Sequence, residues 1–201
     1  MSKRILLVLS AAATAAIVAV PAASAAGKGL LSCGATTKPF SQFGDNASYF
    51  GFSNNGFENG ASGWQLSNAS IGAGNEPWFV NGSGSSSLTI APGGTASSPR
   101  VCTTLLAPMW RMFAHANGAN GSLKAQIVFY GLLGNVTGLL NLTSFDPSRY
   151  ASWEPSGDVP SLLSLPLLTT SAQLRLTSTA TSGIWQVDDV YVDPWLSRNA
   201  G

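Results

Sequence analysis

Apolar positions along this chain come in short runs that alternate with polar residues, and clusters of Gly, Asn, Ser and Pro interrupt them. From Ala47 onward the interruptions recur roughly every ten residues, which is the spacing of short strands in an all-β sandwich or barrel. No segment carries a long, capped apolar period of 3.6 residues, so only minor helix is expected. Strands are predicted at residues 63–66, 78–81, 87–90, 95–103, 109–116, 123–130, 172–177 and 184–192.

The pattern differs between the later segments. In AQLRLTS two leucines face one way, while Gln173, Arg175 and Thr177 face the other. The stretch GLLGNVTGLLNLTSF predicts a hairpin with Asn135 near its turn. The stretch PSGDVPSLLSLPLL contains three prolines. Because proline cannot donate to a ladder, this segment predicts a sheet edge, a long loop or a short helical turn.

The N-terminal segment is typical of a secretory signal peptide. MSKRILLVLSAAATAAIVAVPAASAA has a basic start, an apolar run over residues 5–20 and an A-x-A cleavage site that ends at Ala25. A single membrane anchor is the competing interpretation, but the run is rich in Ala and short for a span of about 20 strongly apolar residues. We expect cleavage after Ala25, a secreted protein and no membrane insertion after the signal is removed.

The sequence therefore predicts a signal peptide over residues 1–25, an N-terminal arm over 26–48, one sandwich domain over 49–194 and a C-terminal tail over 195–201. The two cysteines, Cys33 and Cys102, are expected to form a disulfide that ties down the arm, since an even pair in an exported chain most simply pairs. A metal or catalytic role would need more partners than two thiols and His115 offer.

Charged residues make up 9% of the chain, and its formal net charge is +1. Without residues 1–25, eight basic and nine acidic residues remain and no basic stripe exists, which argues against nucleic acid and anionic membranes as partners. The surface must then be covered mainly by Ser, Thr, Asn, Gln and Gly. The Ala and Gly bias favours a bacterial origin, so the N-x-S/T sequences at Asn46, Asn68, Asn135 and Asn141 are interpreted as chance products of such a surface.

Groups that could move protons or attack a substrate are few. His115 would have to serve any Ser–His–Asp arrangement, and the chain has no G-x-S-x-G, H-E-x-x-H, zinc spacing of Cys and His, or phosphate-cradling glycine loop. The acids that a glycosidase would need as an opposed pair are scattered. We expect that the protein is not an enzyme, with a small secreted hydrolase as the remaining catalytic alternative.

Two acidic features stand out, namely Glu58 in the turn-rich stretch NGFENGASGW and the pair Asp188–Asp189 inside the last predicted strand. Adjacent residues of a strand point to opposite faces, so one Asp can be solvated while the other points inward. A bare buried carboxylate is costly. Its partner is either a bound cation such as calcium, or backbone amides of a turn that Asp188 caps or of the N-terminal arm.

NGFENGASGW together with WQVDDVYVDP resembles the galactose-binding-like jelly roll of carbohydrate-binding modules, which often opens with N-G-x-F-E and a Trp and closes with D-D-V. The opening is one residue shorter here. The resemblance implies an antiparallel, all-β jelly-roll sandwich in which Glu58 and Asp188 hold a structural calcium ion. The wider pattern, including GNEPWFV and the two cysteines, is also similar to uncharacterised secreted actinobacterial proteins. That likeness favours secretion and the disulfide and implies no activity.

Sugar binding needs aromatic rings that stack on pyranose faces beside amides or charges that bond hydroxyls. Trp64, Trp110 and Trp185 are expected in the core, and the strand face that holds Arg111 and His115 is expected to be the exposed, ligand-facing side. The predicted ligand-binding residues are Trp78, Trp153, Arg111, Tyr130 and Glu76. Ordinary partial burial is the alternative for each of them.

The leading hypothesis is a secreted, non-catalytic carbohydrate-binding module with a structural calcium ion, and its partner would be a glycan or cell-surface polysaccharide. The second hypothesis is a structural or adhesive cell-envelope protein that acts through protein contacts. The small hydrolase is the third.

Overall fold

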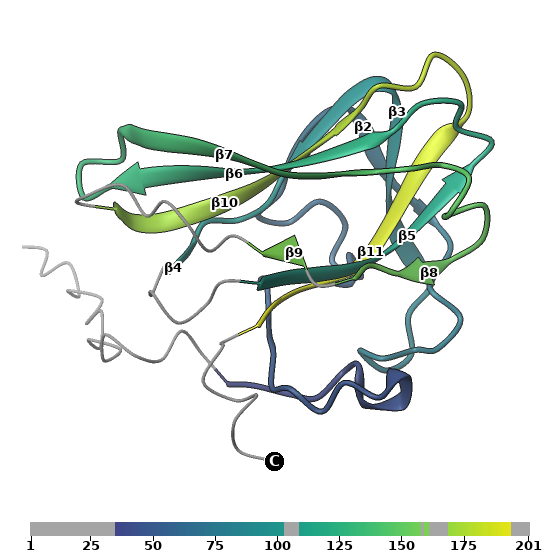
Figure 1. Ribbon diagram of the computed structural model, residues 1–201, viewed down its shortest axis with the longest axis horizontal. Coiled ribbons are helices and arrows are strands. Elements are labelled where there is room, and N and C mark those ends of the chain that lie inside the picture. Colours follow the sequence, from purple (N-terminus) through teal and green to yellow (C-terminus); the bar gives the residue numbers. More distant parts are fainter. Residues whose placement is uncertain (1–34, 103–108, 158, 161–168, 194–201) are drawn as a thin grey trace, which may run out of the picture.

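The strands of the protein form one strongly curled antiparallel sheet in the computed structural model, which describes residues 35–102, 109–157, 159–160 and 169–193 (Figure 1). The strand order is β7-β6-β10-β3-β11-β5-β8, with β2 also paired to β3, β1 to β11, β4 to β10 and β9 to β5. The strands are β1 (Phe50–Gly51), β2 (Gln65–Ala73), β3 (Ser86–Ser97), β4 (Val101–Cys102), β5 (Met109–Asn117), β6 (Leu123–Gly131), β7 (Val136–Phe145), β8 (Glu154–Pro155), β9 (Val159–Pro160), β10 (Thr169–Ser178) and β11 (Ile184–Asp193). Within the described residues the only helix is the 3-10 turn η1 (Ser41–Phe43), so the predicted all-β antiparallel fold is confirmed.

A bend in the middle of β3 turns this sheet into a sandwich. The first half of β3 pairs with β11 and the second half with β10. Between the halves lies Gly93 at φ +68°, followed by Gly94, where an added Cβ would lie 2.2 Å from the carbonyl oxygen of Asn68 on β2. Asn68 Nδ2 donates a hydrogen bond of 2.8 Å to the Pro92 carbonyl oxygen. Because Gly94 has no room for a side chain, the two strands can bend together at this point.

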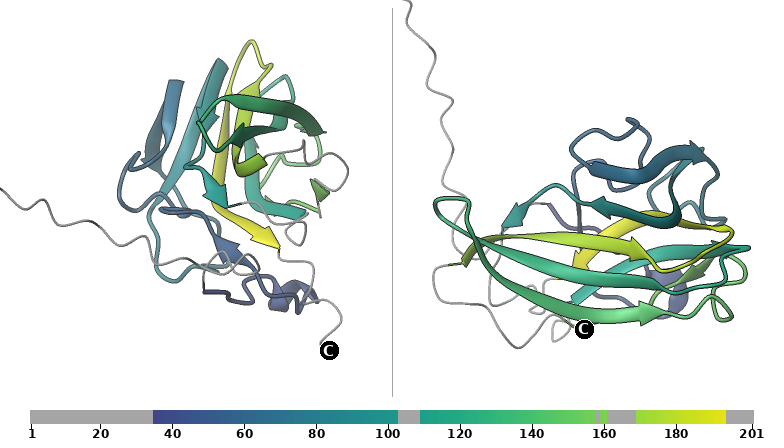
Figure 2. Two further views of the ribbon diagram at one scale, coloured as in Figure 1. Left: turned by 90° about the vertical axis from the view of Figure 1, so that its left-hand side faces the viewer. Right: turned by 90° about the horizontal axis from the view of Figure 1, so that it is seen from above.

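The bend separates two layers, which Figure 2 shows folded over one another. The first layer contains β7, β6, β10, the second half of β3 and the first half of β2. The second layer contains the other halves of β2 and β3 with β11 and β5, and β1, β8 and β9 lie at its edges.

Alternate residues of both layers meet in one apolar core. Trp185 is fully buried, and its indole Nε1 donates to the Gly121 carbonyl oxygen at 2.8 Å. Trp64 and Trp110 are also buried, so the prediction that these three tryptophans belong to the core is confirmed. The inward side chains of the central strands are Leu88, Ile90, Ala96, Met112, Ala114, Leu123, Ala125, Ile127, Phe129, Ala172, Leu174, Leu176 and Val187.

The outer face of the second layer is covered by the chain that precedes β1. Phe40 has no exposed surface and packs against Phe113 of β5 and Tyr191 of β11, with ring centroids 5.5 and 5.6 Å apart. Arg111, which shares this face with Phe113, lies 4.0 Å over the Phe40 ring, and its Nη1 is 2.6 Å from Asp45 Oδ2. The arm therefore closes a second apolar cluster on the outside of the sandwich.

The outer face of the first layer carries polar side chains instead, and we call it the open face. Cross-strand pairing aligns these side chains in rows, and every one of them is exposed or half-buried. The open face consists of Gln65, Ser67, Thr95, Ser97, Lys124, Gln126, Asn141, Ser144, Arg175 and Thr177. Their sequence neighbours point into the core, which is the alternation expected of a half-buried sheet.

The strand predicted at residues 78–81 is wrong, because this segment forms turns. The carboxylate of Glu76 accepts hydrogen bonds from the backbone amides of Trp78 and Val80 at 2.5 and 2.7 Å, so these amides are not available to a ladder. The predicted hairpin around Asn135 is confirmed as β6 and β7, whose turn is closed by a 2.9 Å bond from the Gly131 amide to the Asn135 carbonyl oxygen. The proline-rich stretch contributes only the short edge strands β8 and β9 to the described residues.

Several predictions made for the two ends of the chain fall outside the described residues. The predicted signal peptide, the whole C-terminal tail and Cys33 lie there, and only the backbone of Cys102 is described, so the Cys33–Cys102 disulfide stays a prediction. In the described part of the chain, no helix has the length and apolar character needed to cross a membrane.

Replacement of Phe40 by Ala should lower the free energy of unfolding by about 3–5 kcal/mol, the usual cost of emptying a fully buried aromatic position. Urea denaturation of the purified protein measures the change. Lys38→Ala, an exposed position in the same arm, should stay within about 0.5 kcal/mol of the wild type. Equal stability of the two variants would mean that the arm does not cover the second layer in solution.

Candidate functional site

The open face is a polar surface that regular strand pairing builds across the first layer. One row runs across five strands from Gln65 through Ser97, Arg175 and Gln126 to Asn141. The Gln126 Nε2 donates to Asn141 Oδ1 at 2.7 Å, which fixes both amides relative to each other. Such a row offers hydroxyl, amide and guanidinium groups to one extended ligand.

The next row of the open face consists of Ser67, Thr95, Thr177, Lys124 and Ser144. Its two outer serines are exposed, as is Lys124, while the two threonines are half-buried. Four hydroxyl groups and one ammonium group therefore lie beside the first row. Both rows rest on rigid strands, so their positions are set by the ladder and not by loop conformation.

Tyr130 lies at one end of the open face, but its ring is not exposed as a platform. Its exposed fraction is 8%, and the guanidinium carbon of Arg100 lies 3.6 Å from the ring centroid. The Tyr130 hydroxyl donates to Gln173 Oε1 at 2.7 Å, and Gln173 Nε2 donates to the Ser98 carbonyl oxygen at 2.7 Å. Tyr130 therefore positions Arg100 in two ways. Its ring contacts the guanidinium, and its hydroxyl, through Gln173, fixes the backbone of Ser98 two residues before Arg100.

Trp78 and Trp153 both pack, half-buried, against the second apolar cluster on the other layer. Trp78 packs between Phe43 and Phe113, with centroid distances of 5.1 and 5.3 Å. Trp153 lies 5.7 Å from the ring of His115. Much of each indole therefore serves packing, as the alternative interpretation of these residues has it.

The strand face that holds Arg111 and His115 is not exposed as expected. Arg111 is 9% exposed, because the arm covers it and its Nε donates to the Ser156 carbonyl oxygen at 3.1 Å. His115 Nδ1 lies 3.1 Å from Gln186 Oε1. The expectation failed because the segment that covers this face is remote in sequence. Arg111 lies with Trp78 and Trp153 around one cluster, whereas Tyr130 belongs to the opposite layer.

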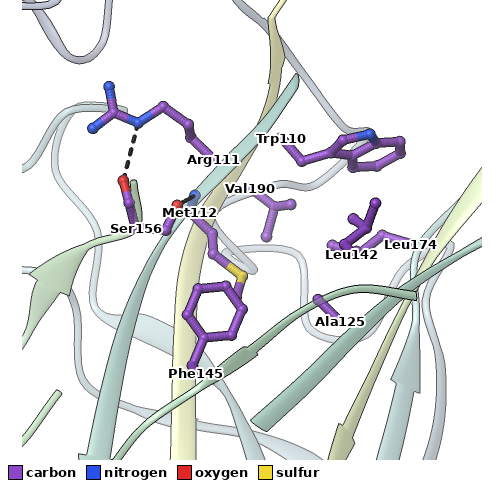
Figure 3. A pocket seen from close by; sticks show the side chains of 9 residues that line it. All are labelled: Trp110, Arg111, Met112, Ala125, Leu142, Phe145, Ser156, Leu174 and Val190. Atoms are coloured by element: carbon purple, nitrogen blue, oxygen red, sulfur yellow. Dashed lines mark hydrogen bonds between the residues drawn. The ribbon is translucent and has the colours of Figure 1, made fainter. Parts of the chain in front are cut away.

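Figure 3 shows a small cavity between the layers, with Trp110 and Leu174 on its walls and the Arg111–Ser156 contact at its rim. The cavity encloses only about 10 Å³, room for one water molecule, and its walls are apolar. It is a packing gap and not a ligand site, since ligand pockets measure some hundreds of Å³.

Three carboxyl groups are buried together on the second layer. Glu76 and Asp188 have no exposed surface, and Asp189 is 2% exposed. Asp188 accepts the backbone amides of Glu76 and Asp189 at 3.1 and 2.9 Å. Amide donors were one of the two expected partners, although these amides belong to other segments than the N-terminal arm.

The expectation that one of the two aspartates is solvated is wrong. The pairing of β11 with β5 shifts register between Asp188 and Tyr191, and Asp189 adopts φ +50° within this bulge. A bulge abolishes strict alternation, so both side chains enter the protein. Asp189 forms hydrogen bonds with Asn81 and Glu76, but its Oδ1 is buried without a partner.

Burial strongly disfavours the charged form of these groups. Burial first, and then the charge of Asp189, raises the pKa of Asp188 from 3.8 to about 9. Burial and the charge of Glu76 likewise raise the pKa of Asp189. Among the described residues the one ion pair joins Arg111 to Asp45, so no ion pair there neutralises this carboxyl cluster.

Glu58, the other predicted calcium ligand, is exposed. Its Oε1 accepts the backbone amides of Ser85 and Ser86, each at 2.8 Å, which lowers its pKa through the Ser85 bond first. No contact joins it to Asp188 in the described part of the structure. Within the same residues, no group of three or more His, Cys, Asp or Glu side chains could by itself hold a metal ion.

The open face was visible in the sequence only as the alternation of Gln173, Arg175 and Thr177. Gln126 and Asn141 carry no motif, and nothing in the order of residues says that they stand beside Arg175. Their signal is the register of β6 with β7 and β10, which depends on where the turns fall.

No protein-family model and no curated protein matches the sequence. Among solved structures, the tandem CBM22-1–CBM22-2 domain of Paenibacillus barcinonensis Xyn10C is similar at a TM-score of 0.51 and 14% identity, over 73% of this chain and 46% of that chain. The CBM22-1–GH10 modules of Clostridium thermocellum xylanase 10B, complexed with xylohexaose, are similar at a TM-score of 0.50 and 12% identity, over 72% and 28%. The chain thus spans less than half of each. At these identities the likeness establishes the fold alone, an all-β jelly-roll sandwich that the chain shares with these modules.

Proposed function

We propose that the protein is a secreted, non-catalytic carbohydrate-binding module that binds a glycan chain along the open face. The observation that carries the proposal is the pair of polar rows that cross five strands of the first layer. Glycans present hydroxyl groups at regular intervals, and rigidly held amides, hydroxyls and guanidinium groups are their natural hydrogen-bond partners. The fold shared with modules of two xylanases supports the same class of ligand.

The geometry favours the open face over the surface around Trp78 and Trp153. The two indoles are partly used by packing, whereas on the open face Gln126 and Asn141 bond to each other and every side chain is exposed or half-buried. Trp78, Trp153, Arg111, Tyr130 and Glu76 stay predicted ligand residues. The variants described below separate the two surfaces.

An adhesive role through protein contacts is the second candidate function, and one observation favours it. Leu132 and Leu133, at the turn between β6 and β7, have exposed fractions of 85% and 93%. Two adjacent leucines left in water at a protruding turn are typical of a contact surface. A secreted hydrolase has less support, because the buried acids face the arm side of the fold and not an open cleft.

We also propose that a calcium ion binds beside Asp188 and Asp189. The donor set consists of the hard carboxylate and backbone oxygens that calcium prefers, and the unpartnered Asp189 Oδ1 supports a missing cation there. Since three acidic side chains do not suffice as ligands in the described residues, backbone oxygens would have to contribute. Calcium supplies charge compensation to the buried acids and no chemistry. Glu58, which the sequence paired with Asp188 as a calcium ligand, stays a prediction.

The glycan proposal predicts that the purified protein is retarded by soluble polysaccharide in affinity gels. Gln126→Ala and Asn141→Ala should each weaken binding about fivefold, the effect of losing one net hydrogen bond of about 1 kcal/mol. Trp153→Ala should leave binding unchanged if the ligand lies on the open face. Urea midpoints check that the variants remain folded.

Retention that disappears with Trp153→Ala but not with Asn141→Ala would move the site to the arm side. If no polysaccharide is retained, the module hypothesis fails. A concentration-dependent oligomer that Leu132→Ser and Leu133→Ser disrupt would then favour the adhesive role.

The carboxyl cluster predicts a pH-dependent stability. With a chelator present, the free energy of unfolding should fall as pH rises from about 4 to about 9, because Asp188 holds its proton over that range only in the folded state. Asp188→Asn should flatten this slope. Calorimetry at a series of pH values measures both.

Calcium should raise Tm of the wild type at pH 8, with a gain of about 2.7 kcal/mol at 100 times its Kd, and should reduce the slope by replacing the proton. Asp189→Asn should lose most of this gain, and Glu58→Gln tests whether Glu58 is a ligand as the sequence predicts. A Tm that calcium leaves unchanged at pH 8 would reject the site.

A further inference from the structure

The open face is cationic as well as polar. Lys124 and Arg175 belong to its rows, and Arg100 stands at its end over Tyr130. None of the three side chains has an ion-pair partner among the described residues, where the one ion pair is that of Arg111 with Asp45. Only 9% of the residues in this chain are charged. Three cations without an ion-pair partner among the described residues therefore distinguish this face from the rest of the surface.

None of the carboxylates whose side chains the structure describes forms an ion pair with a cation of this face. Asp45 pairs with Arg111, and Glu58 accepts the amides of Ser85 and Ser86. Asp146, which follows β7, bonds to its own turn through Ser148. Glu76, Asp188 and Asp189 are buried in the other layer, and Glu154 lies on β8 at its edge. The charge of the open face is therefore not balanced within the described structure.

Arg100 is held in place before any ligand arrives. Its guanidinium stacks on Tyr130, an arrangement that leaves the edge nitrogens free to donate. The Ser98 amide donates to the Leu174 carbonyl oxygen at 2.9 Å, Ser98 Oγ accepts the Leu174 amide at 3.0 Å, and Gln173 holds the Ser98 carbonyl. The backbone two residues before Arg100 is thus fastened to β10, which lowers the ordering cost of binding.

The cations are spaced along the strands. Arg175 stands opposite Gln126, and Lys124 lies two residues further from Tyr130 on β6. At about 3.3 Å per residue, the path from Lys124 to Tyr130 is roughly 20 Å. A ligand that meets all three must therefore be a chain that carries anionic groups repeatedly, and not a single small anion.

We propose that the ligand of the open face is an acidic polysaccharide whose uronate carboxylates pair with Arg100 and Arg175. This inference rests on the proposed glycan-binding function and names its ligand class. A guanidinium matches a carboxylate with two parallel, charge-assisted N–H donors, whereas a neutral sugar hydroxyl accepts a weaker hydrogen bond without that charge. The hydroxyl and amide rows then bond the sugar hydroxyls between the carboxylates.

Titration calorimetry with polygalacturonate oligomers and with neutral galactan oligomers of equal length tests the proposal. The acidic oligomers should bind at least tenfold more tightly than the neutral ones. Added salt should weaken the binding of the acidic oligomers and leave that of the neutral ones nearly unchanged. Arg175→Gln and Arg100→Gln should each weaken the acidic ligand about fivefold and leave the neutral one nearly unchanged. Arg175→Lys keeps the positive charge but loses the two parallel N–H donors. Its affinity for the acidic oligomers should fall between those of the wild type and Arg175→Gln.

Lys38→Gln, which removes one exposed charge from the arm, is the matched control and should bind like the wild type. Equal affinity for both oligomers would overturn the acidic ligand and leave the glycan function standing. A loss of affinity in Lys38→Gln as large as in Arg175→Gln would show that only the net charge of the protein matters. That result would also overturn the acidic ligand of the open face. Binding of dextran sulfate in place of polygalacturonate would assign the face to sulfated chains instead. No binding to any of these chains would overturn the glycan function itself.

Discussion

The packing of Phe40 on the outside of β5 and β11 determines how the two faces of this molecule differ. Each layer of a sandwich has an outer face. The outer face of the second layer carries the rings of Phe113 and Tyr191. These rings need an apolar cover, which the segment before β1 supplies together with the Arg111–Asp45 ion pair. The first layer carries no such rings in its two rows, so it needs no cover. The two layers thus differ because β5 and β11 present aromatic residues on their outer face, whereas the two rows of the open face do not.

This dependence explains how far the sequence could predict the structure. Short apolar and alternating runs located β5, β6, β10 and β11, because burying one face of a strand tends to impose a period of two on its residues. The side of Arg111 could not be predicted in this way, since alternation separates two faces but does not say what covers either. The cover came from Phe40, some seventy residues earlier, and only tertiary packing brings the two together.

Local chemistry set the other limits of prediction. Residues 78–81 have the composition of a strand, yet the carboxylate of Glu76 takes up the amides of Trp78 and Val80 and bends the chain into turns. The aspartate pair was correctly seen as unusual, but the bulge at Asp189 placed both acids inside. The open face was the least predictable part, because Gln126, Asn141 and Arg175 become neighbours only through strand register.

The place of β11 in the sheet has a consequence for the order of folding. This strand is the last one in the chain, yet it lies between β3 and β5 and also pairs with β1. While the chain is being made, β3 and β5 have no common partner, and the second layer has a gap at its centre. The second layer can close only after β11 has been made, which makes folding dependent on contacts of long sequence separation and slow. Until β11 pairs, the facing edges of β3 and β5 stay exposed, and such unpaired edges are open to pairing with other chains.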